Sequence, residues 1–154
     1  MRRATALTTA LFLGGTAFLS APLPAVAGTG ETIQVNARAW TEHYTDVGRK
    51  GESAGDSIDF TEKLFQHGDR VGRDSGHCVV KRVTRRSFTL QCFVTLTFRG
   101  RGDLTVQGAV TFTRRNNENP VLAVTGGTGD YAGASGEFEI TESNGRDHYV
   151  IRLI

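Results

Sequence analysis

Hydrophobic and polar residues alternate along much of the chain with a period of two. The clearest run covers residues 104–113, where Leu104, Val106 and Val110 alternate with polar or small residues. This pattern is typical of a strand with one face on a core and the other in water. Comparable β-forming segments cover residues 33–45, 56–65, 76–83, 88–96, 120–124, 137–142 and 148–154. We therefore predict about eight strands and no helix after residue 27, which indicates a sandwich or a closed barrel.

Turn-forming residues separate these segments. Asn144-Gly145 predicts a hairpin of type I′, because that turn needs positive φ at both central residues. Residues 126–136 contain Gly127-x-Gly129-x-x-Ala132, a spacing that resembles a dinucleotide-binding loop. Such a loop needs a helix after it, whereas residues 137–141 alternate as a strand does. These glycines are therefore predicted to link two strands.

The first 27 residues have the pattern of a secretory signal peptide. Arg2-Arg3 precedes a mostly apolar run, and Ala25-Val26-Ala27 ends the segment with small residues. We expect cleavage after Ala27, which leaves residues 28–154 as one secreted, extracellular domain without a stable membrane anchor. The alternative is an uncleaved anchor, but Gly14-Gly15 and the cleavage site argue against it.

Removal of the leader changes the charge balance. The whole sequence has 18 basic and 16 acidic residues, and the leader contains two arginines and no acid. The secreted domain is therefore close to neutral, which gives no support for a nucleic-acid partner. Arg101-Gly102-Asp103, a tripeptide that integrins recognise, lies between two predicted strands and is interpreted as a turn.

The two cysteines are expected to form one disulfide, Cys78–Cys92, because an exported chain meets an oxidising compartment. Residues 76–83 and 88–96 are separated by a short polar segment. If they form a hairpin centred on Arg85, Cys78 lies opposite Cys92. A reactive thiol is the alternative interpretation.

Other candidate chemistry is sparse. The four histidines show no ligand spacing with the cysteines, so neither a metal nor another cofactor is expected. Seven phenylalanines follow residue 27, together with one tryptophan and three tyrosines. These aromatic residues are enough either to line a cavity inside a closed barrel or to fill its core.

From Gly55 onward the sequence resembles the allene oxide cyclase barrel family and, more loosely, plant dirigent proteins. The resemblance rests on ordered motifs: Gly55-Asp56-x-x-x-Phe60-x-x-Lys63-Leu64, Gly76-x-Cys78-Val79-Val80, Leu104-x-Val106-Gln107-Gly108 and the glycine-rich segment 122–136. It implies an eight-stranded antiparallel β-barrel of the calycin type, with a hydrophobic cavity and a homotrimeric assembly. Members of this family cyclise a fatty-acid epoxide, steer the coupling of phenols or shape cyclisations of natural products.

The catalytic residues of the plant cyclases do not carry over. Their Glu-x-Asn element is missing here, and Glu62 replaces a second asparagine. We therefore do not expect plant-type allene oxide cyclase activity. For another reaction, Glu62 is the candidate acid or polarising group, Trp40 and Tyr44 are candidates for the mouth or wall of the cavity, and Gln107 is a candidate for orienting a substrate oxygen. Each also has a structural explanation, as a solvated, intersubunit or packing residue.

Three functions are consistent with these observations. The first is a secreted isomerase, cyclase or stereocontrolling protein that acts on a small hydrophobic molecule, largely by orienting it. The second is a non-catalytic carrier of an apolar ligand, and the third is a structural barrel with a filled interior. A buried carboxylate facing a cavity would favour the first, a purely apolar cavity the second, and the absence of a cavity the third. We favour the first.

Overall fold

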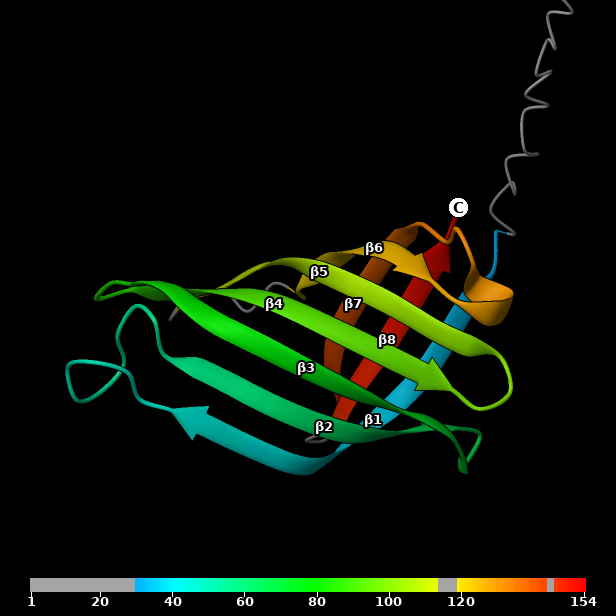
Figure 1. Cartoon of the computed structure of the whole chain (residues 1–154), viewed down its shortest axis with the longest axis horizontal. Helices are drawn as coiled ribbons and strands as arrows, with labels where there is room; N and C mark the ends of the chain where they lie inside the picture. Colours follow the sequence, from blue (N-terminus) through cyan, green and yellow to red (C-terminus); the bar gives the residue numbers. More distant parts are fainter. Residues whose placement is uncertain (1–29, 114–118, 144–145) are drawn as a thin grey trace, which may run out of the picture.

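The chain forms a closed antiparallel barrel of eight strands, as predicted (Figure 1). The computed structural model describes residues 30–113, 119–143 and 146–154. Each strand pairs with its neighbours in sequence, and β8 pairs with the first part of β1, from Thr32 to Asn36, which closes the barrel. The strands are β1 (Thr32–Thr45), β2 (Ser57–Gln66), β3 (Asp69–Val83), β4 (Ser87–Phe98), β5 (Gly102–Thr113), β6 (Val121–Gly127), β7 (Gly136–Ser143) and β8 (Arg146–Leu153).

The alternation in the sequence decides which face of each strand is buried. On β5, Leu104 and Val106 point into the barrel, whereas Thr105 and Gln107 are exposed. Strand β3 begins at Asp69, seven residues before its predicted start. The prediction missed these residues because Gly72 and Asp74 occupy interior positions and interrupt the hydrophobic pattern. The predicted Asn144-Gly145 turn and the signal peptide lie outside the described residues.

A disulfide joins Cys78 to Cys92, which are directly opposite each other on β3 and β4. The hairpin turn runs from Thr84 to Ser87, with the Thr84 amide donating to the Ser87 carbonyl over 2.8 Å. The pairing of β3 with β4 shifts by one residue between Val80 and Arg82, so the residues next to the turn pair in a different register from the residues around the disulfide. The predicted pairing of the cysteines is confirmed.

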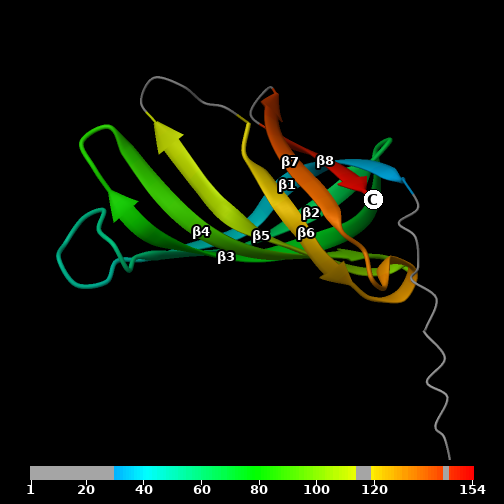
Figure 2. The ribbon, with the colours of Figure 1, turned by 90° about the horizontal axis from the view of Figure 1, so that it is seen from above.

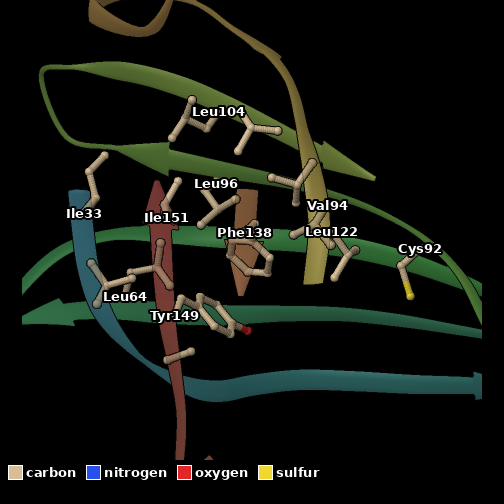
Figure 3. Close-up of a cluster of buried hydrophobic side chains, with 14 of the residues drawn as sticks. Ile33, Leu64, Cys92, Val94, Leu96, Leu104, Leu122, Phe138, Tyr149 and Ile151 are labelled. Carbon is tan, nitrogen blue, oxygen red and sulfur yellow. The ribbon is translucent and has the colours of Figure 1, made fainter. Parts of the chain in front are cut away.

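One end of the barrel is filled with side chains. It is the end that holds the start of β1 and the C-terminus (Figure 2). Figure 3 shows its buried residues gathered on one side of Phe138 and Tyr149, with Cys92 on the other side. The fully buried aliphatic residues at this end are Leu64, Leu96, Leu104 and Ile151.

The glycine-rich segment links β6 to β7 at the filled end, as predicted, through the 3-10 turn η1 (Gly129–Tyr131). Arg101, which ends the turn between β4 and β5, binds both carboxylate oxygens of Glu31 at 2.9 and 3.0 Å. Its guanidinium also lies 4.8 Å from the ring centroid of Tyr131. The arginine of the Arg-Gly-Asp tripeptide therefore joins the turn between β4 and β5 to Glu31 and to η1.

Candidate functional site

A cavity of about 410 Å³ occupies the other half of the barrel. Ala39 on β1 is a small residue in its wall, and Gly76 on β3 leaves room for another wall residue, Phe60. Gly76 lies directly opposite Phe60, and a Cβ atom at position 76 would approach the Phe60 ring to 2.1 Å. The missing side chain thus gives the Phe60 ring its place in the cavity wall.

Two polar residues meet at the inner end of the cavity. Tyr149 on β8 donates a hydrogen bond from its hydroxyl to Oε2 of Glu62 on β2. Both side chains line the cavity, although their residues are only 4% and 8% exposed. The Tyr149 ring is held by Phe138, with ring centroids 4.8 Å apart. The carboxylate and the hydroxyl therefore occupy fixed positions at the boundary between core and cavity.

Asp74 lies beside this pair. It is directly opposite Glu62 on β3, is fully buried, and neither of its carboxylate oxygens has a hydrogen-bond partner among the described residues. Burial, and then the charge of Glu62, raise the pKa of Asp74 to about 8. At neutral pH the side chain is therefore mainly the neutral acid.

The same surroundings keep Tyr149 neutral. Burial raises the pKa of its hydroxyl far above the ordinary value, and the charges of Asp74 and Glu62 raise it further. Tyr149 is therefore a hydrogen-bond donor throughout the physiological range. Closer to the mouth, burial also raises the pKa of Asp147, with smaller contributions from Glu62 and Glu142.

This arrangement suits general acid and base chemistry. A neutral carboxylic acid and a second carboxyl group lie side by side, and the Tyr149 hydroxyl orients the second one. Carboxyl groups held in a cavity can serve as general acids or bases. The rest of the wall is mainly apolar, which strengthens electrostatic interactions with a bound molecule.

The structure separates the four candidate residues of the sequence analysis. Glu62 lines the cavity. Trp40 is 56% exposed on the outer surface, where the Lys63 ammonium lies 4.6 Å from its ring centroid. Gln107 also faces outwards. Tyr44 is not among the residues that line the cavity, and its hydroxyl donates a hydrogen bond to Asp56 over 2.5 Å.

The sequence analysis missed Asp74 and Tyr149, although both can be found from strand alternation. Asp74 has the same parity as Cys78 on β3, and Tyr149 has the same parity as Ile151 on β8. Glu42 was missed for another reason. The strand pairing shifts by one residue between Ala39 and Thr41, which turns the later residues of β1 to the opposite face and brings Glu42 into the cavity wall.

Within the described residues, no group of three or more His, Cys, Asp or Glu side chains is arranged to hold a metal ion. In that same part of the chain, no helix has the length and apolar character needed to cross a membrane.

Residues 29–153 match the family model of the allene oxide cyclase barrel-like domain. The chain belongs to this family. The match covers all eight strands and agrees with the closed barrel and with the resemblance seen in the sequence motifs. No curated protein sequence matches the chain.

Several solved structures share the barrel. A pyocyanin demethylase is 26% identical, with a TM-score of 0.71, over 80% of this chain and 100% of that one. The Diels Alderase AbmU from Streptomyces koyangensis is 15% identical, with a TM-score of 0.61, over 82% of this chain and 70% of that one. The pterocarpan synthase dirigent protein PsPTS1 is 12% identical, with a TM-score of 0.61, over 86% of this chain and 97% of that one. The solved structures that share this barrel thus include a Diels Alderase, a dirigent protein and a demethylase.

Proposed function

We propose that this protein is a secreted enzyme that isomerises or cyclises a small, largely apolar molecule in its barrel cavity. The observation that carries the proposal is the buried hydrogen bond from Tyr149 to Glu62 at the inner end of the cavity. A carrier of apolar ligands has no need for a buried carboxylate at this position, since burial of such a group is costly. A filled structural barrel has no need for the cavity.

In the proposed reaction, the apolar wall orients the substrate and Glu62 exchanges a proton with it. Tyr149 donates its one hydroxyl proton to Glu62 and so holds the carboxylate in place. Positioned acids and bases contribute about 10²- to 10⁴-fold in rate, and orientation contributes further. Secretion is supported by the signal-peptide pattern and by the disulfide, which is compatible with an extracellular protein.

Activity profiling tests the proposal. The purified, oxidised protein is incubated with a small-molecule extract of the culture medium of its producer, and the mixture is compared by liquid chromatography with mass spectrometry, which separates isomers, with one that contains heat-inactivated protein. We expect one compound to be consumed and a product of equal mass to form. Consumption of no compound would contradict an enzyme, and retention of an unchanged compound would favour the carrier.

A second candidate reaction is demethylation. It is favoured by the 26% identity to the pyocyanin demethylase over the whole length of that protein. Pyocyanin is therefore added to the protein as a single substrate, and its mass is followed with time. Loss of a methyl group would support demethylation, whereas unchanged pyocyanin would argue against action on this substrate.

A further inference from the structure

The cavity has two chemically different walls. Strands β3, β4 and β5 and the start of β6 contribute no charged side chain to it. Their lining side chains are apolar or sulfur-containing, apart from Asn119, and include Leu90, Val94, Val110 and Leu122. This half of the wall can bind only the body of a ligand, through apolar contact.

The opposite wall is acidic. Its carboxylates come from strands that are consecutive around the barrel: Glu142 on β7, Asp147 on β8, Glu42 on β1 and Glu62 on β2. Among the described residues, no lysine, arginine or histidine lines the cavity. Four carboxyl groups therefore share one cavity without a basic partner in its wall.

Asp74 adds a fifth carboxyl group behind this wall. Its side chain is fully buried, takes the interior side of β3 and has no hydrogen-bond partner among the described residues. A buried polar group without a hydrogen-bond partner destabilises the fold, and a role in binding or catalysis is one reason for its retention. It lies directly opposite Glu62, the wall carboxyl group at the inner end of the cavity.

The carboxyl groups of the cavity wall indicate which ligand charge the cavity favours. Glu62 is buried and Asp147 is half-buried, whereas Glu42 and Glu142 are exposed. The carboxylates that water screens least repel an anion and attract a cation most strongly. Building on the proposed function, we propose that the substrate is an organic cation: an apolar body that packs against β4, β5 and β6, with a positively charged nitrogen facing β7, β8, β1 and β2. The cavity volume of about 410 Å³ suits a heteroaromatic ring system of two or three rings.

A matched set of probes tests the charge preference. N-methylacridinium is a cation, acridine is neutral at about pH 8, and acridine-9-carboxylate is an anion with the same ring system. Their binding to the purified wild-type protein is measured by fluorescence titration. We expect the cation to bind at least about tenfold more tightly than acridine, and the anion to bind most weakly, because each close carboxylate contributes to the difference.

Variants locate the effect in the acidic wall. Glu142→Gln and Asp147→Asn are expected to weaken binding of the cation severalfold and to leave acridine binding unchanged. Glu137→Gln and Asp59→Asn are matched controls on outward positions of β7 and β2, and we expect no change from either. Equal affinity for the three probes, no binding of the cation, or equal weakening of cation and acridine in the variants would overturn the proposal.

The result is independent of turnover. A charge preference without any conversion in the activity profile would support the cation site and contradict the proposed enzymatic function. Conversion of a compound by a protein that shows no charge preference would support the enzymatic function and contradict the cation site.

Discussion

The hydroxyl of Tyr149 binds the carboxylate of Glu62, although the two residues are 87 positions apart in the sequence. Closure of the barrel brings them together, because β8 pairs with β1 and β1 pairs with β2. The contact marks the boundary between a packed half of the barrel and a hollow half. The same fold that buries the aliphatic core thus places a carboxylate where a ligand can reach it.

Asp74 is expected to make stability depend on pH. Its folded-state pKa of about 8 lies above the value near 3.9 in an unfolded chain, so the folded state binds more protons between these values. The free energy of unfolding should therefore fall as the pH rises from about 4 to about 8. Asp74→Asn should remove this dependence, and urea unfolding of both proteins at about pH 5 and pH 8 measures it. An equal effect of the substitution at both pH values would contradict a buried neutral acid.

Asp56 should have the opposite dependence. Hydrogen bonds from the Tyr44 hydroxyl and then from the amides of Val47 and Ser53 lower the pKa of Asp56 to about 2. Its stabilising contribution is therefore present above the unfolded value near 3.9 and is lost as the pH falls towards 2.

The measurement is the melting temperature of the wild type and of Asp56→Asn at about pH 7 and about pH 3. We expect the variant to melt lower at pH 7 and the gap to narrow at pH 3. Asp59→Asn, on the exposed side of β2, serves as the control. A gap that stays constant would show that Asp56 acts through its shape and not through its charge.

The disulfide should stabilise the fold mainly by restricting the unfolded chain. Cys78 and Cys92 close a loop with a sequence separation of 14, which corresponds to about 3 kcal/mol on the chain-entropy model. The double variant Cys78→Ser with Cys92→Ser should lose about this free energy of unfolding in urea. The wild type in a reducing agent should behave in the same way, and a loss well below about 1 kcal/mol would contradict the prediction.

Position 76 should accept no side chain larger than that of glycine unless the Phe60 ring moves. The Cβ atom of Gly76→Ala would lie 2.1 Å from the Phe60 ring, so the ring must move into the cavity. We expect a loss of about 1 to 3 kcal/mol in stability and weaker binding of any cavity ligand.

The double variant Gly76→Ala with Phe60→Leu tests the cause of that loss. Leucine lacks the distal ring atoms that clash, so the double variant should lose less stability than the sum of the two single variants. Additive losses would show that the Phe60 contact is not the reason for glycine at position 76.

Strand alternation was sufficient to predict most of the fold. It placed Leu104 and Val106 inside the barrel, and strand spacing placed Cys78 opposite Cys92. The choice of a barrel over a sandwich came from the family motifs, because alternation gives the two faces of each strand and not the closure of the sheet.

The site was less predictable because it depends on closure and on one irregularity. Glu62 was a candidate from its position in a family motif, but its partner Tyr149 comes from the last strand. The register shift beside Trp40 reverses the faces of β1 in a way that the sequence pattern does not indicate, so that Glu42 lines the cavity while Trp40 lies outside. Long-range pairing and bulges are the features that local patterns do not contain.

The central claim, that Glu62 takes part in proton transfer, is tested most directly by kcat for the compound that activity profiling identifies. The wild type is compared with Glu62→Gln, which keeps the size of the side chain and removes its ability to accept a proton, and with Asp59→Asn as the outward control on the same strand. We predict that Glu62→Gln lowers kcat by at least about 100-fold, in line with the contribution of a positioned acid or base, and that Asp59→Asn leaves it unchanged. A Glu62→Gln protein that is folded, binds the compound and turns it over at the wild-type rate would contradict the claim.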